Sequence, residues 1–290
     1  MTITGAVSRA SLAEARERFE SVVASAVAGG AGGSSPQTDS GGSDLAGLGG
    51  DLFAVLHLID REHGLRRAVS DPARDGADKA QLVRILLEGK VSPAALGLVA
   101  DIVGLRWSSP SELSDAVETL AVTAEAARAE AEGRIDDLED ELFRFSRVIE
   151  SEIALRGALA APGLPDERKL GLVQALLEGK VTPSALTLIT ELVLRPRGRS
   201  LEGGLAEYGK IVAQRRQRLV ALVRTPAELS EEQRARLAAV LAAAYGHDVH
   251  LNIELDPTAI GGLSIEIGDE IIDGTIAGRL DDVRRRLGTG

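Results

Sequence analysis

Apolar residues recur every three or four positions through most of the first 218 residues, as expected of helices that bury one face. The clearest stripe consists of Leu138, Leu142, Phe145, Ile149 and Ile153. Residues 112–132 give another long helical segment, and Gly133 is placed where a helix should break. The pattern predicts a mainly α protein built from packed helices.

A repeat divides this helical region. Residues 86–98 read LLEGKVSPAALGL and residues 176–188 read LLEGKVTPSALTL, with ten of thirteen positions identical and an offset of 90. The correspondence continues in both directions without a gap. It predicts a duplicated antiparallel helical bundle, with the same helix order in residues 52–103 and 142–193, because a repeat of this length is a domain-sized unit.

The repeated stretch carries the signals of a helix–turn–helix corner. Gly89 can end a helix in the left-handed conformation, Ser92 can cap the next helix, and Pro93 suits the first helical position. The second copy has Gly179, Thr182 and Pro183 in these places. A phosphate-binding loop would need a GxxxxGK sequence followed by Ser or Thr after a strand, and Gly89-Lys90 and Gly179-Lys180 are followed by Val.

Two segments differ from the helical pattern. Residues 29–50 are rich in Gly and Ser, which predicts a flexible insert without fixed structure. After residue 218 the period changes: 219–223, 249–255 and 263–267 predict strands, and Ser230 with Gln233 predicts the start of a helix. Gly268-Asp269 predicts a hairpin turn, and residues 276–287 a last helix.

The chain is therefore expected to contain three domains. Residues 1–112 form a helical bundle with the insert at 29–50, residues 113–217 a second helical bundle, and residues 218–290 a small α+β domain.

Composition restricts the function. Aromatic residues make up 2%, so the core must consist of Leu, Val, Ile and Ala. A net charge of −11 argues against a nucleic-acid partner, since phosphate contacts need a basic surface. With no cysteine there is no disulfide or thiolate ligand. No apolar run reaches the roughly 20 residues that span a bilayer, so membrane association is expected only through a partner.

Candidate chemistry is sparse. His247 and His250 with Asp248 lack a fourth ligand for a tetrahedral metal site. His57 corresponds to Arg147 of the second copy and is expected to be exposed. Without a catalytic triad, an HExxH sequence or a dinucleotide loop, the sequence predicts no catalytic residue, no metal and no cofactor.

The 37 residues from Leu251 to Leu287, close to the C-terminus, contain spaced elements that fall in a recognisable order. They are Asp256, Pro257, Gly261, Gly262, Gly268, Asp273, Gly274 and Arg279. This signature resembles that of the F-type ATP synthase delta subunit family, also called the oligomycin-sensitivity-conferring protein. The resemblance covers about residues 113–287, and the preceding residues look like an extra copy of the helical domain.

The resemblance implies a non-catalytic stator subunit. In the family, the helical domain binds N-terminal segments of the alpha subunits of the catalytic head, and the C-terminal domain binds the b subunits of the peripheral stalk. It implies a peripheral location at the cytoplasmic face of the cell membrane. The alternative is a generic adaptor whose duplicated bundle binds amphipathic partner helices. Which copy would bind alpha stays open.

Overall fold

The protein divides into two compact units, a helical unit of Met1–Arg216 and a tail unit of Gln217–Gly290. The computed structural model describes residues 3, 5–31, 41–216, 219–227, 229–245, 249–256, 262–267 and 270–273. Within these residues, no helix has the length and apolar character needed to cross a bilayer.

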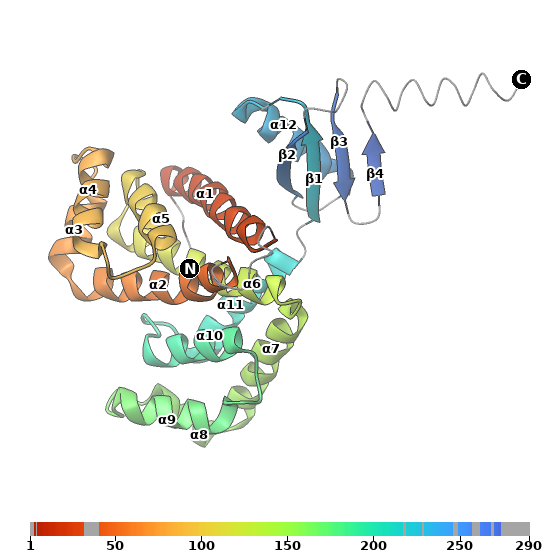
Figure 1. Ribbon diagram of the computed structural model, residues 1–290. Coiled ribbons are helices and arrows are strands. Elements are labelled where there is room, and N and C mark those ends of the chain that lie inside the picture. Colours follow the sequence, from red (N-terminus) through yellow and green to blue (C-terminus); the bar gives the residue numbers. More distant parts are fainter. Residues whose placement is uncertain are drawn as a thin grey trace, which may run out of the picture. The chain divides into compact units, whose positions relative to one another are not determined.

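Eleven helices build the described part of the helical unit (Figure 1). They are α1 (Ala6–Ala31), α2 (Gly41–Arg61), α3 (His63–Ser70), α4 (Gly76–Leu87), α5 (Pro93–Gly104), α6 (Pro110–Ala131), α7 (Ile135–Ser151), α8 (Ile153–Ala160), α9 (Asp166–Leu177), α10 (Pro183–Leu194) and α11 (Leu201–Arg216). The mainly α prediction is confirmed.

The helix boundaries follow the sequence repeat. α3, α4 and α5 begin and end 90 residues before α8, α9 and α10, and α2 ends 90 residues before α7. The expected helix order in residues 52–103 and 142–193 is thus confirmed, whereas the superposition of the two spans stays a prediction. Below, the first repeat means α2–α5 and the second repeat means α7–α10.

Local chemistry fixes the corner within each repeat. Gly89 and Gly179 end their helices with φ of +71° and +72°, a conformation that costs glycine little. The hydroxyl of Ser92 accepts from the backbone N–H of Ala95, and Thr182 caps α10 in the same way. The caps expected from the sequence are therefore present in both repeats.

Helix α6 lies between the two repeats (Figure 1). It contacts α1, α2, α3 and α5 on one side and α7, α10 and α11 on the other. Four consecutive residues, Leu120 to Thr123, are all buried, so every face of the helix is covered by protein at this level. One helix therefore contributes to the core around both repeats.

The prediction of a flexible insert at residues 29–50 is wrong for its first three residues, which end α1, and for its second half. Helix α2 begins at Gly41, and Leu45 and Leu48 are buried in the core. These two residues continue at helical spacing into Leu52, so burial of this stripe outweighs the poor helix propensity of the glycines. Residues 32–40 lie outside the described part of the chain.

The described residues of the tail unit form a four-stranded sheet, with α12 (Glu231–Tyr245) between its first two strands in sequence. The strands are β1 (Leu219–Thr225), β2 (Val249–Leu255), β3 (Ser264–Ile267) and β4 (Glu270–Asp273), in the order β2-β1-β3-β4. β1 and β2 are parallel, and the other pairs are antiparallel. The unit has its own core of Ala221, Val223, Leu241, Ile265 and Ile267.

The start of α12 shows the capping box expected from Ser230 and Gln233. The backbone N–H of Ser230 donates to the Gln233 amide oxygen at 2.8 Å, and that of Gln233 donates to the Ser230 hydroxyl at 3.3 Å. The expected turn at Gly268-Asp269 and helix at 276–287 lie outside the described residues.

Candidate interaction site

The repeated corner is a structural joint rather than a phosphate loop. The N–H of Lys90 donates to the carbonyl of Leu87, and the N–H of Ser92 donates to the Asp51 carboxylate at 2.8 Å. In the second repeat, Glu141 accepts from the backbone N–H of Thr182 at 2.8 Å. These amides are engaged within the protein, so they do not form a cradle for an anion.

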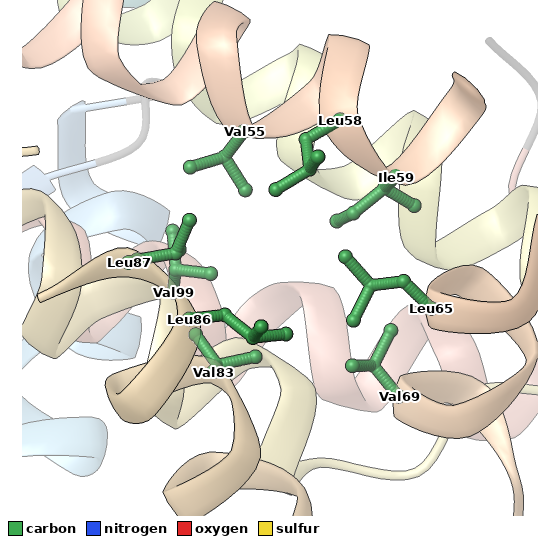
Figure 2. A pocket seen from close by; sticks show the side chains of 9 residues that line it. All are labelled: Val55, Leu58, Ile59, Leu65, Val69, Val83, Leu86, Leu87 and Val99. Carbon is green, nitrogen blue, oxygen red and sulfur yellow. The ribbon is translucent and has the colours of Figure 1, made fainter. Parts of the chain in front are cut away.

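An apolar hollow lies inside the first repeat (Figure 2). It is lined by Val55, Leu58, Ile59, Leu65, Val69, Val83, Leu86, Leu87 and Val99, which come from α2, α3, α4 and α5 and point towards one another. Its volume of about 10 Å³ holds at most one water molecule, and the lining offers such a water no polar partner. This hollow is a packing defect and not a ligand site.

A larger hollow is open on the face formed by α1, α2 and α5. Its volume is about 390 Å³, and it is lined by Ser21, Val22, Ser25, Ala26, Leu45, Leu48 and Ala94. Ser21 and Ser25 donate to carbonyls of their own helix, so their hydroxyls are already bonded. With an apolar floor and no charged residue among the lining residues that the structure describes, the hollow suits apolar side chains of a partner segment better than a polar small molecule.

Buried charges join α6 to the connection between α10 and α11. The side chain of Glu118 is 1% exposed and accepts from Arg197, from Arg199 and, at 2.8 Å, from the hydroxyl of Tyr208. Arg197 also contacts Asp60 of α2 at 2.9 Å. Burial, and then the Glu118 carboxylate, raise the pKa of Tyr208 well above its ordinary value, which keeps its hydroxyl protonated.

This cluster is a cross-link and not a catalytic centre. Each charged group in it faces an opposite charge within the protein, which leaves no activated nucleophile or free acid. Arg197 lies in the connection that follows the second repeat, and it pairs with Asp60 of α2 in the first repeat. The two repeats are therefore held together by charge as well as by the shared helix α6.

Glu125 of α6 is a second buried acid. Its side chain is 2% exposed, and burial raises its pKa to about 7, against the opposing effects of Ser184 and Arg128. Gly49 of α2 faces it so closely that a Cβ there would lie 2.3 Å from a Glu125 carboxylate oxygen. Glu125 lines neither of the two hollows described above, so we assign its buried carboxyl to stability and not to chemistry.

The histidines form no metal site in the part of the chain that the structure describes, where no three His, Cys, Asp or Glu residues are grouped for metal binding. The expectation that His57 is exposed is wrong: it is half-buried, and its Nε2 lies 2.7 Å from the Glu191 carboxylate. The reason is that His57 lies on the side of α2 that faces Glu191 of α10. His247 and Asp248 lie outside the described residues.

Three of the eight signature residues are described. The backbone N–H of Asp256 donates to the carbonyl of Thr225 at 2.9 Å, where the parallel strands β1 and β2 end. Gly262 has φ of +96°, a conformation that side chains disfavour. Asp273 pairs with Ser264 across β3 and β4. The remaining five, Pro257, Gly261, Gly268, Gly274 and Arg279, lie outside the described residues.

These features define a class of protein before any comparison: a helical protein with an internal repeat and one open apolar hollow, joined to a small α+β unit. Comparison with known proteins then gives the family. The profile described as ATP synthase delta (OSCP) subunit matches residues 122–287.

Relatives match over almost the whole chain. ATP synthase subunit delta of Thermobifida fusca is 47% identical over 281 residues, covering 97% of this chain and 98% of the relative. The subunit delta proteins of Streptomyces griseus and Streptomyces avermitilis are each 44% identical, covering 97% and 99% of this chain and 98% and 99% of their own lengths. The chain belongs to the ATP synthase delta (OSCP) subunit family, whose members are non-catalytic subunits of ATP synthase.

Those relatives include the residues that precede the profile match, so the N-terminal helical region is shared with them. A chain of the Toxoplasma gondii mitochondrial ATP synthase hexamer aligns with 57% of this chain and 96% of its own length, at 18% identity. Its TM-score of 0.27 is too low to define a common arrangement.

Proposed function

We propose that this chain is the stator subunit that links the catalytic head of a proton-translocating F-type ATP synthase to its peripheral stalk, as a peripheral protein at the cytoplasmic face of the membrane. The family assignment supports the complex. The observation that supports a linking role is the division into two units, each with a separate core, which gives one chain two independent binding bodies.

In this proposal the helical unit binds N-terminal segments of the alpha subunits. The open hollow on α1, α2 and α5 supports this assignment, because an amphipathic helix can place apolar side chains on Leu45, Leu48 and Val22. The tail unit binds the b subunits. The signature residues, Asp256 and Gly262 among them, then serve the backbone geometry of that unit rather than a chemical step.

We also infer that the helical unit arose by duplication, with one copy in residues 1–112 and the other in residues 113–217. The helix contacts around the first repeat recur around the second. α2 packs on α6 as α7 packs on α11, α1 packs on α5 as α6 packs on α10, and α4 packs on α5 as α9 packs on α10. In this scheme α6 is the first helix of the second copy and also packs on the helices of the first copy as α11 packs on those of the second.

Separate fragments test the division of labour. Residues 1–216 should bind a synthetic peptide of the alpha N-terminus and not the soluble part of b, and residues 217–290 should do the reverse. In the whole chain, Val22→Glu should weaken peptide binding at least tenfold, because it places a charge in the apolar hollow. Val7→Glu, on the same helix but already exposed and outside that hollow, is the matched control.

Isothermal titration calorimetry gives the dissociation constants. Binding of b by both fragments, or equal losses for the Val22 and Val7 variants, would refute the assignment. Circular dichroism of each fragment and variant separates lost binding from lost folding.

A further inference from the structure

The last turn of α11 is buried and paired, directly before the chain enters the tail unit. Arg215 is 7% exposed, and its guanidinium lies 3.0 Å from the Glu20 carboxylate of α1 and 2.7 Å from the Glu130 carboxylate of α6. Helix ends ordinarily fray, because their last carbonyl groups have no partner within the helix. Here the side chain of the penultimate helical residue ties the end of α11 to two other helices.

Arg216 extends this connection to a third helix. Its guanidinium lies 2.8 Å from the Glu139 carboxylate and 3.6 Å from the Asp136 carboxylate, both on α7. Cations at this place also face the negative end of the α11 dipole. The last two residues of the helical unit are thus arginines that pair with acids of α1, α6 and α7. Below, the terminal anchor means Arg215 and Arg216 with these acids.

The other end of α11 is also bound to α6. Arg199, just before α11, pairs with Glu118, and the hydroxyl of Tyr208 donates to the same carboxylate at 2.8 Å. This contact uses Glu118, which precedes Glu130 on α6. The two helices therefore run in the same direction, with ionic contacts near both ends. A pull along the axis of α11 from its C-terminal end slides it along α6 and acts first on the terminal anchor.

The arginine of the terminal anchor does not come from the repeat. The position 90 residues before Arg215 carries Glu125, which is buried on α6 and faces Gly49 of α2. The caps of the corner recur in both repeats, whereas of these two equivalent positions only the one beside the tail unit carries an arginine. The packing of such a helix therefore does not by itself require an arginine there.

We propose that the terminal anchor carries mechanical load from the tail unit into the helical unit. Tension on the tail unit enters the helical unit at the peptide bond after Arg216, which is the covalent link between them. Charge-assisted hydrogen bonds are short and directional, so they resist small displacements that non-directional apolar contacts tolerate. Helix α6 then distributes the load, since it packs on both repeats. The inference rests on the proposed linking role for the source of that load.

Pulling on the whole chain in an optical trap tests the proposal. The chain has no cysteine, so two introduced cysteines define where the handles attach. In the first geometry, Gln217→Cys and Ile85→Cys load the end of α11 directly. In the second geometry, Ile85→Cys and Ile153→Cys load the two repeats without pulling on that end. Ile85 and Ile153 are 66% and 71% exposed, so cysteine at these positions leaves the core unchanged.

Arg215→Gln should lower the unfolding force, in proportion, at least twofold more in the first geometry than in the second. Arg216→Gln gives the same comparison at a side chain that is 46% exposed, so it tests the proposal even if the Arg215 variant does not fold. Lys210→Gln removes an exposed cation from the same helix and should change neither force. Equal proportional losses in the two geometries, or no loss in the first, would overturn the proposal.

The pulling measurement needs no other subunit, so its result is independent of the fragment-binding experiment. If the fragments do not divide the binding of alpha and b while the force preference holds, the linking role is wrong and the terminal anchor stands. If binding divides as expected but the forces fall equally, the two arginines only stabilise the fold and the proposal is wrong.

Discussion

Glu125 sets how the helical unit responds to pH at the scale of a single residue. Burial raises its pKa from 4.5 to about 7. A carboxyl with a raised pKa holds more protons in the folded than in the unfolded chain between these values. The contribution of Glu125 to the free energy of unfolding is therefore highest below about pH 4.5, where Glu125 is protonated in both states. It falls as the pH rises through about 7, by about 3 kcal/mol at most.

Glu125→Gln should remove this dependence, because the amide keeps the shape and carries no charge. At pH 8 the variant should be more stable than the parent chain by about 2 kcal/mol, and near pH 4.5 the difference should vanish. Urea unfolding at pH 4.5, 6 and 8 measures it. Asp140→Asn, at an exposed acid on α7, is the control and should change little. Parallel pH profiles for the Glu125 variant and its parent would contradict this account.

At the scale of single residues, the sequence predicted the helix caps but not the buried acids. Gly89, Ser92 and their equivalents were predictable because caps depend on local geometry alone. Glu118 and Glu125 were not, since acids on a long helix usually face water. The available signal was their position among Leu, Val and Ala residues in α6, whose apolar residues cover all faces instead of one stripe.

Helix packing in the first repeat depends on a close approach between α4 and α5. A Cβ added at Gly76 would lie 2.6 Å from the carbonyl oxygen of Gly104, and a backbone atom cannot move aside as a side chain can. Gly97 of α5, by contrast, has no atom within 4 Å of its virtual Cβ. The two positions make a matched pair within one repeat.

Gly76→Ala should destabilise the chain by about 1–3 kcal/mol, as overpacking does. Gly97→Ala should stabilise it by about 0.5–1 kcal/mol, because alanine loses less backbone entropy in a helix. Denaturant unfolding of both variants provides the measurement. Equal effects of the two substitutions would show that the α4–α5 approach is not tight.

The element that the sequence misjudged is the first half of α2. Glycine and serine between 41 and 50 predicted a coil, yet the packing of Leu45 and Leu48 decides the conformation there. The difference between Phe53, which is buried, and Phe143, which is 65% exposed, was equally hidden, since identical residues at equivalent positions differ only in what the fold places beside them.

For the whole molecule, the shared helix α6 predicts how the protein unfolds. Since α6 packs on both repeats, the helical unit should unfold in one transition despite its internal repeat, with the tail unit separate. The expected domain boundary at residue 112 stays a prediction. Hydrophobic periodicity in the sequence identifies a helix there but cannot show that this helix packs on two bundles.

Leu52→Ala tests this cooperativity. It opens a cavity in the first repeat at a cost of about 2–5 kcal/mol. Hydrogen exchange under mild denaturant should then show the second repeat losing protection by the same amount, with the strands of the tail unit unchanged. Leu241→Ala in the tail core is the reciprocal control. A second repeat that keeps its protection would mean that the two repeats fold independently.

Because α6 packs on both repeats, its length cannot change freely during evolution. A linker between two bundles can gain or lose residues without consequence, but α6 has no such freedom, since it is packed on both sides. One residue inserted at its middle would turn the second repeat by about 100° and advance it by about 1.5 Å relative to the first. Asp60 would then no longer meet Arg197. The length of this one helix fixes the angle at which the two halves are held.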